Sequence, residues 1–205
     1  WRAEHHHPEY LITARDYKTG ATYLSYSHEK SSTATAIFID YLLFSLHNYG
    51  INPETITIQT DNGKEFTNPH SQKLTLFEKI VIEKYKARHK LIPYQRPTYN
   101  SDVESFHNLI EEEFFISEKP NNETDLLAKT FPYQIWFNSY RTNRGRDNQN
   151  PEQIYQTELN TDKAIPLIPP IVVDNYIPLM GKKVKGGYFL PLPPKINQFF
   201  ALTIG

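Results

Sequence analysis

The sequence contains no cysteine among its 205 residues and no long hydrophobic run. Without cysteine the protein forms neither disulfides nor thiolate metal sites, which is compatible with a reducing compartment. A membrane-spanning helix needs about 18 or more consecutive apolar residues, and no such run is present. No signal-peptide pattern occurs at the start of the chain. The chain begins at Trp1 rather than Met, as expected for a processed or truncated product.

An excess of positive charge is also lacking. The 22 Lys and Arg residues balance 23 Asp and Glu residues, which leaves a formal net charge of −1. Any surface that binds nucleic acid must therefore be a local basic patch rather than a field of the whole molecule. The length suits one domain with an appendage, and the 39% hydrophobic and 14% aromatic residues are typical of a globular protein with a substantial core.

The pattern of apolar residues predicts alternating strands and helices. Strands are expected at 1–6, 10–13, 21–27, 55–60 and 90–93, and helices at 31–49, 71–88, 101–116 and 123–141. Ser31 or Ser32 caps the first helix, Gly50 ends it, and Pro132 kinks or delays the last one. This order predicts an α/β fold with a mixed five-stranded sheet, three antiparallel strands followed by two parallel ones, and helices on both faces.

The composition changes after Asn160. Seven of the fifteen prolines lie in the last 45 residues, and helical periodicity is absent there. We therefore predict a core at residues 1–160 and a C-terminal arm or small β-rich appendage at residues 161–205. The appendage is expected to pack mainly outside the core or against a second subunit. The run from Gly181 to Gly187 favours a basic hairpin loop.

The stretch QTDNGKEF at residues 59–66 has two interpretations. Asn62 and Gly63 are typical of a tight turn, because they tolerate the positive φ angles that such turns require. Asp61 also follows an expected strand, and open α/β sheets place their sites at the carboxyl ends of strands. The local sequence leaves open whether Asp61 forms a turn or binds a metal.

Two further carboxylates have similar alternatives. Ser101 and Glu104 match the capping box, in which the glutamate bonds back to the start of its helix. A carboxylate in the first helical turn can instead face a metal. Glu4 lies in the middle of the first expected strand. The adjacent residues 5–7 are histidines, but neighbouring strand residues point to opposite faces, so they indicate surface positions or an engineering remnant rather than one metal site.

Taken together, Glu4, Asp61 and Glu104 can converge at one edge of the expected sheet. Carboxylate oxygens are the ligands that Mg²⁺ and Mn²⁺ prefer. Two such ions on either side of a phosphate activate the attacking oxygen and stabilise the leaving one. The three acids together therefore indicate a site for divalent metal ions.

Four stretches, in the right order, resemble the catalytic core of insertion-sequence transposases and retroviral integrases. They are YLITARDYKTGATYLSY (10–26), ITIQTDNGKEF (56–66), RPTYNSDVESFHNLIEEEF (96–114) and WFNSYRTNRGRDNQNPEQIY (136–155). The resemblance covers roughly residues 1–157 and implies a ribonuclease-H-like fold. It implies that Asp61 is the second metal-binding acid and Glu104 the third, with Asn100 in the third-acid motif. The last stretch matches an aromatic-Asn-x-x-Arg signature followed by a proline that opens a short helix.

The resemblance also implies the reaction and the partners. Two Mg²⁺ or Mn²⁺ ions would serve hydrolysis that frees a DNA 3′-hydroxyl and attack of that hydroxyl on target DNA. The partners would be element ends, target DNA and further copies of the chain in a synaptic complex, in the cytoplasm of a bacterium. Six further residues have two interpretations, as nucleic-acid contacts or as ordinary polar surface residues: Lys64, Arg96, Tyr99, Asn100, His107 and Asn108. The basic group Arg141, Arg144 and Arg146 contacts phosphate or pairs with the acidic run 111–113.

Two features depart from the family pattern. The first acid of the family is an Asp in a Trp-x-x-Asp setting, whereas this sequence has Glu4 after Trp1. Either the enzyme works with Glu4, or activity is reduced, or the first Asp lies upstream. The 42 residues between Asp61 and Glu104 also make a longer spacing than usual. Two rival functions therefore remain: another nuclease of the same fold, or a catalytically silent DNA-binding or assembly protein.

Overall fold

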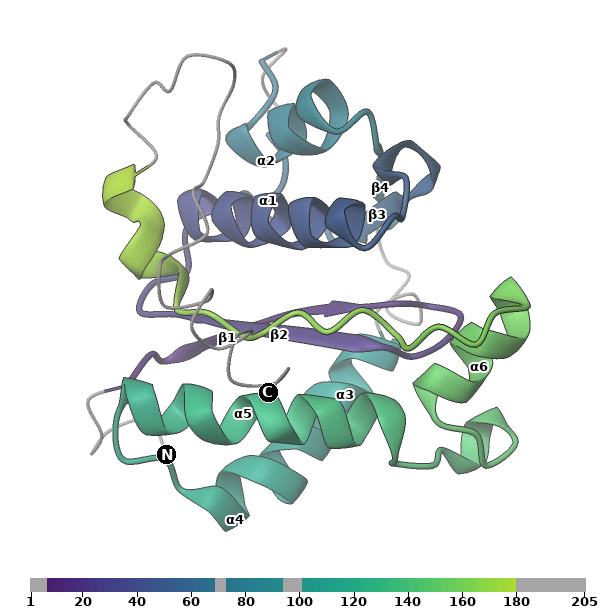
Figure 1. The fold of residues 1–205 in the computed structure, drawn as a ribbon. Helices are drawn as coiled ribbons and strands as arrows, with labels where there is room; N and C mark the ends of the chain where they lie inside the picture. The colour runs from purple at the N-terminus through teal and green to yellow at the C-terminus, as the bar shows by residue number, and fades with distance from the viewer. Residues whose placement is uncertain (1–6, 69–72, 94–100, 180–205) are drawn as a thin grey trace.

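The computed structural model describes residues 7–68, 73–93 and 101–179. Its elements are β1 (Tyr10–Arg15), β2 (Thr22–Ser27), α1 (Ser32–Asn48), the 3-10 helix η1 (Pro53–Thr55), β3 (Thr57–Thr60), α2 (Leu76–Glu78), the π-helix η2 (Lys79–Lys84), β4 (Arg88–Leu91), α3 (Ser101–Ile110), the π-helix η4 (Glu111–Phe115), α4 (Ile116–Glu118), α5 (Glu123–Ser139), the 3-10 helix η5 (Arg144–Arg146), α6 (Pro151–Leu159) and the 3-10 helix η6 (Val173–Leu179). The hairpin β1–β2 lies between α1 on one side and α3, α4 and α5 on the other (Figure 1).

The prediction of one five-stranded mixed sheet is wrong. The strands form two separate two-stranded sheets, one from β1 and β2 and one from β3 and β4. β1 pairs with β2 in antiparallel fashion, and β3 pairs with β4 in parallel. The order of elements was close to the expected one, but joining the two sheets requires a strand that bonds to both. No strand in the described part of the chain does so, and the strand expected at residues 1–6 lies outside that part.

The caps of α1 confirm what the local sequence predicts. Ser31 is the N-cap, and its hydroxyl accepts a hydrogen bond from Ala34 N at 3.1 Å. Gly50 follows the helix with a φ of +91°, a conformation that glycine adopts without steric cost. The helix expected at 71–88 is instead the short α2 followed by the π-helix η2. Pro132 lies inside α5.

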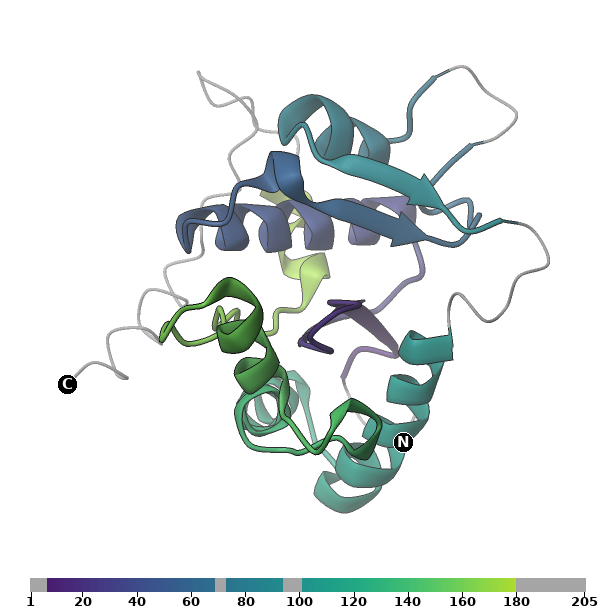
Figure 2. The ribbon, with the colours of Figure 1, turned by 90° about the vertical axis from the view of Figure 1, so that its right-hand side faces the viewer.

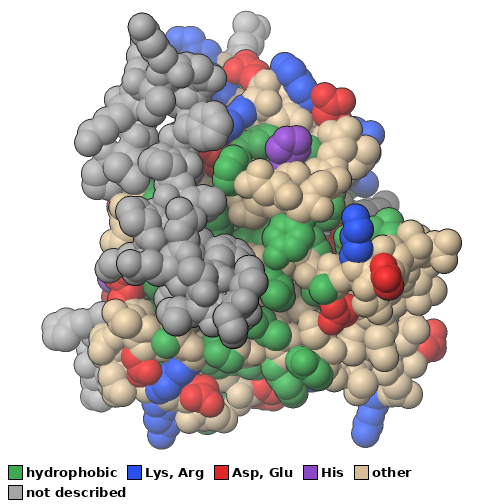
Figure 3. Space-filling view, in the orientation of Figure 1, with side chains coloured by type: hydrophobic (Ala, Val, Ile, Leu, Met, Phe, Trp, Pro, Cys, Tyr) green, Lys and Arg blue, Asp and Glu red, His purple; other side chains and the backbone are tan. Residues whose placement is uncertain are grey.

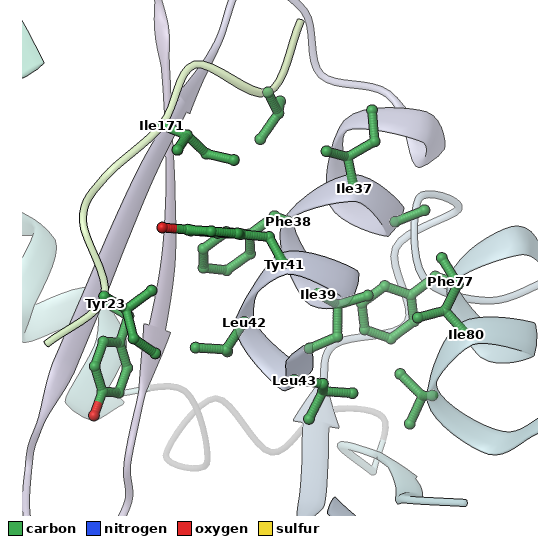
Figure 4. Packing of buried hydrophobic residues seen from close by; sticks show 14 of the residues in the cluster. Tyr23, Ile37, Phe38, Ile39, Tyr41, Leu42, Leu43, Phe77, Ile80 and Ile171 are labelled. Atoms are coloured by element: carbon green, nitrogen blue, oxygen red, sulfur yellow. The ribbon is translucent and has the colours of Figure 1, made fainter. Parts of the chain in front are cut away.

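Helix α1 is apolar over most of its circumference, so it is buried against several elements at once. Its residues Ile37, Phe38 and Leu42 contribute to a cluster that reaches Tyr23 on β2 and Phe77 on α2 (Figure 4). The same helix carries a buried carboxylate, Asp40, which accepts hydrogen bonds from Lys84 Nζ at 2.6 Å and Tyr85 Oη at 2.7 Å. These contacts attach η2 to α1 and satisfy a charge that would otherwise be costly to bury.

A second cluster covers the opposite face of the hairpin. Leu24 and Tyr26 of β2 point into it, whereas Tyr23 points toward α1, as the two-residue period of a strand requires. The cluster is completed by aromatic and aliphatic residues of α3, η4 and α5: Phe106, Ile110, Phe114, Phe115, Leu126 and Phe137. Because both faces of β2 are covered, every one of its six residues is buried.

The segment after α6 runs back along the hairpin (Figure 1). Ile165, Ile168 and Ile171 are buried in the first cluster, and Tyr41 Oη donates to Pro169 O at 2.9 Å. The division at residue 160 stays a prediction for residues 161–205 as a whole. The described part of this segment, residues 161–179, contributes to the core. Residues 180–205, including the expected hairpin at 181–187, lie outside the described part.

Candidate functional site

Asp61 comes directly after β3, and its carboxylate is exposed at the surface. Its Oδ1 accepts a hydrogen bond from Gly63 N at 2.8 Å, which is the contact of an Asx turn. The neighbouring Asn62 donates from Nδ2 to Ile92 O at 2.8 Å, so the loop is attached to the chain just after β4. The structure therefore shows an Asx turn at Asp61, but neither Asn62 nor Gly63 has the positive φ angle of the predicted tight turn.

Gly63 lies where two carboxylates approach each other. A Cβ atom at this position would lie 2.6 Å from Glu65 Oε2 and 2.9 Å from Asp61 Oδ1, distances that real Cβ atoms do not adopt. Glu65 also forms an ion pair with Lys30 at 3.1 Å. The carboxylates of Glu65 and Asp61 raise the pKa of this largely exposed lysine, Glu65 more strongly. Sequence reasoning missed Glu65, although it stands in the same short motif as Asp61.

Glu104 lies in the first turn of α3, and it is exposed. The same turn carries Asp102, whose Oδ2 accepts a hydrogen bond from Arg15 Nε at 2.6 Å. The Arg15 side chain is 6% exposed, and its Nη1 also donates to Gly20 O at 2.9 Å and Thr22 Oγ1 at 2.8 Å. This buried arginine attaches the start of α3 to the hairpin. The structure describes α3 from Ser101 onward, so the capping-box interpretation stays a prediction.

The carboxyl ends of β3 and β4 and the start of α3 lie on the same side of the molecule (Figure 2). Asp61 and Glu104 are the predicted metal ligands at these two positions. The third predicted ligand, Glu4, lies outside the described residues, as do Arg96, Tyr99 and Asn100. Within residues 7–68, 73–93 and 101–179, no three side chains of His, Asp or Glu form a group that could hold a metal ion. The three-acid site therefore stays a prediction.

The remaining predicted nucleic-acid contacts lie near the two acids in sequence. Lys64 and Asn108 are exposed. His107 shares a hydrogen bond with Thr13 Oγ1 at 3.1 Å. Burial lowers the pKa of His107, and the carboxylate of Glu104 opposes that shift without reversing it. This shift favours the neutral, hydrogen-bonding form of His107 in the absence of DNA.

The basic group near the end of α5 is largely engaged within the protein. Arg141 donates to both carboxylate oxygens of Glu113, from Nη2 at 2.7 Å and from Nε at 3.0 Å, so it pairs with the acidic run. Arg146 donates to Tyr17 O at 3.1 Å and to Lys18 O, and it lies 3.8 Å from Asp102. On the face shown in Figure 3, charged side chains of both signs are interspersed around the margin.

A comparison of the sequence with models of known protein families finds no match, and a comparison with curated proteins finds none either. The resemblance to insertion-sequence transposases therefore rests on the four stretches themselves. Among the described residues, no helix combines the length and the apolar character that crossing a membrane requires.

Proposed function

We propose that this chain is the catalytic core of a DNA transposase or integrase of the insertion-sequence type, which cleaves and joins DNA strands with divalent metal ions. The observation that carries the proposal is the position of two acids. Asp61 follows the end of β3, and Glu104 lies in the first turn of the helix that comes after β4, the parallel neighbour of β3. Both residues are exposed. The end of β3 and the start of α3, which carry them, lie on the side to which β3 and β4 run (Figure 2).

The closing signature WFNSYRTNRGRDNQNPEQIY gives independent support. Its Asn138 is buried and bonds to the backbone of β2, and its Pro151 is the first residue of α6. Asn150 caps that helix through a capping box with Gln153. The residues that carry the resemblance thus have definite structural roles in the same core that holds Asp61 and Glu104.

The donor chemistry at these positions suits Mg²⁺ or Mn²⁺, because it consists of carboxylate oxygens without thiolate. Asp61, Glu104 and Glu4 would hold the metal, which supplies stabilisation of negative charge on the phosphodiester when bound. The chain's own contribution is to hold the acids in place. The Asx turn and the Asn62–Ile92 contact fix the loop of Asp61, and Arg15 with Asp102 fixes the start of α3. The reaction needs no covalent protein–DNA intermediate.

One alternative function has a specific observation in its favour. Glu4 occupies the position of the family's first aspartate, and its side chain is one methylene longer. Metal sites tolerate only about 0.5 Å of misplacement, so this change can reduce or remove activity. The chain would then be a transposase-derived protein that binds DNA or assembles on it without cutting.

The test is DNA cleavage and strand transfer on one sample. The purified chain is incubated with supercoiled plasmid and a labelled short duplex in Mn²⁺, in Mg²⁺ and with EDTA. The proposal predicts nicking of the plasmid and joining of the label to it, both abolished by EDTA. Binding of the duplex with no cleavage in either metal would favour the silent DNA-binding protein. A chain that neither binds nor cleaves DNA would contradict both.

A further inference from the structure

We propose that Glu78 and His89 form a positioning pair that holds both ends of the loop 61–67, and with it the carboxylate of Asp61. Glu78 belongs to α2 and His89 to β4, and neither residue lies in the stretches that resemble transposases. The effect on metal binding rests on the proposed function. The effect on the loop does not, because it follows from contacts within the protein.

The first end of the loop is held by His89 through Thr60. The Thr60 hydroxyl donates to Asp61 O at 2.9 Å, and His89 Nε2 lies 2.9 Å from Thr60 Oγ1. A hydroxyl has only one proton, so Nε2 of His89 carries a hydrogen and donates it to Thr60. The His89 side chain is 4% exposed, and burial lowers its pKa, which keeps the ring neutral at pH 7.

The second end of the loop is held by Glu78. Thr67 is buried, and its hydroxyl donates to Glu78 Oε1 at 2.9 Å. The other carboxylate oxygen, Oε2, accepts from Thr75 N at 2.8 Å, while the Thr75 hydroxyl donates to Phe66 O at 2.8 Å. Burial opposes the ionisation of Glu78, but its hydrogen bonds from Thr75 and Thr67 hold its pKa below the ordinary value.

The two supports lie close together and are joined by aromatic contacts rather than by a hydrogen bond. His89 Nδ1 lies 3.9 Å from Glu78 Oε1, and the His89 ring packs edge-on against Phe77 with centroids 5.3 Å apart. Phe77 in turn packs against Phe66, near the second end of the loop, at 5.2 Å. Displacing the loop would therefore break buried hydrogen bonds at both ends and disturb the aromatic contacts between them.

This arrangement explains how an exposed carboxylate can hold a fixed position. Asp61 itself is at the surface, and its Oδ1 accepts a hydrogen bond from Gly63 N within the same turn. The rigid support comes from the buried layer below it. Groups that orient a metal ligand in this way typically change metal affinity by about 10–100-fold when removed.

The experiment compares variants that delete or retain each contact. Thr60→Val removes the hydroxyl without changing the shape of the side chain, and Thr60→Ser retains it. His89→Phe keeps an aromatic ring against Phe77, and His89→Gln retains a side-chain N–H. Thr57→Val is the matched control, because Thr57 lies on the same strand and its exposed hydroxyl accepts from Arg88 Nε at 2.9 Å rather than contacting the loop 61–67. The readouts are the dissociation constant for Mn²⁺, the amide hydrogen exchange of residues 61–67 and the melting temperature.

Thr60→Val and His89→Phe should weaken Mn²⁺ binding by about tenfold and speed amide exchange in the loop, whereas Thr60→Ser and His89→Gln should stay close to the parent. If amide exchange of residues 61–67 in Thr60→Val equals that of the parent, the inference is wrong. This outcome decides the matter even if His89→Phe does not fold. A parent that binds no Mn²⁺ would refute the proposed function alone, because faster exchange in Thr60→Val would still support the positioning pair.

Discussion

The side chain of Asn138 on α5 bonds to both backbone groups of Thr22 on β2. Its Oδ1 accepts from Thr22 N, and its Nδ2 donates to Thr22 O, each at 2.9 Å. Gln134, one turn earlier, accepts from Leu24 N at 2.9 Å, and Tyr26 N donates to Ile171 O at 2.8 Å. Beside β2, amide side chains and the segment near Ile171 therefore satisfy backbone groups that a further strand would otherwise satisfy.

Replacing Asn138 with alanine should lower the free energy of unfolding by about 1–3 kcal/mol, because it leaves buried backbone groups of β2 without partners. Urea denaturation followed by circular dichroism measures the change. Asn108→Ala is the control, since Asn108 is exposed on α3, and it should change stability by less than about 0.5 kcal/mol. Equal stabilities of the two variants would show that the contacts to Thr22 contribute little.

Gly63→Ala should weaken Mn²⁺ binding, since the added methyl group would lie within 3 Å of the carboxylates of both Glu65 and Asp61 and force them apart. Gly145→Ala is a matched control, because its nearest atom, Asn143 Oδ1, would lie 3.4 Å from the new Cβ atom. Isothermal titration with Mn²⁺ measures both variants. Unchanged binding by Gly63→Ala would mean that the positions of these two carboxylates do not matter for the metal.

The unfolding free energy should depend on pH through His89. Burial puts the pKa of His89 in the folded protein below its ordinary value of 6.5. The unfolded chain therefore binds more protons, so stability is highest above about pH 6.5 and falls as the pH drops through the interval between the two pKa values. His89→Gln cannot take up this proton, so its stability should fall less between pH 7.5 and 5.5 in urea titrations. If the unfolding free energies of His89→Gln and of the parent fell equally between pH 7.5 and 5.5, His89 would not be the source of the pH dependence.

The role of Glu4 follows from the sequence alone, because residues 1–6 lie outside the described part. Glu4→Asp should keep or raise metal-dependent cleavage, since it restores the acid that the family uses. Glu4→Gln should abolish cleavage, because a neutral amide does not offset the charge of the metal. Cleavage assays in Mg²⁺ compare both with the parent. Full activity of Glu4→Gln would mean that the first acid lies elsewhere.

Local features of the fold could be predicted from the sequence. Ser31 caps α1 and Gly50 follows it, and the proline of the closing signature, Pro151, opens α6. Each depends on interactions between residues a few positions apart, which sequence patterns encode directly. The Asx turn at Asp61 is also a local feature, but the positive φ angles predicted for Asn62 and Gly63 do not occur.

Contacts between distant parts of the chain could not be predicted in this way. The pairing of strands into two sheets, the amide contacts of Asn138 with Thr22 and the support of the 61–67 loop by His89 all join residues far apart in sequence. A buried histidine in a short strand has no periodicity that distinguishes it from an exposed one. The π-helical turns likewise depend on packing, as the contacts of Asp40 with Lys84 and Tyr85 illustrate.

The most direct test of the central claim is plasmid cleavage in Mn²⁺ by Asp61→Asn and Glu104→Gln, with Glu111→Gln as a control that removes an exposed carboxylate from η4. If Asp61 and Glu104 hold the catalytic metal, both variants should lose cleavage, keep the melting temperature of the parent and bind Mn²⁺ more weakly, whereas the control should behave like the parent. Cleavage by either variant at the parental rate would contradict the proposed metal site.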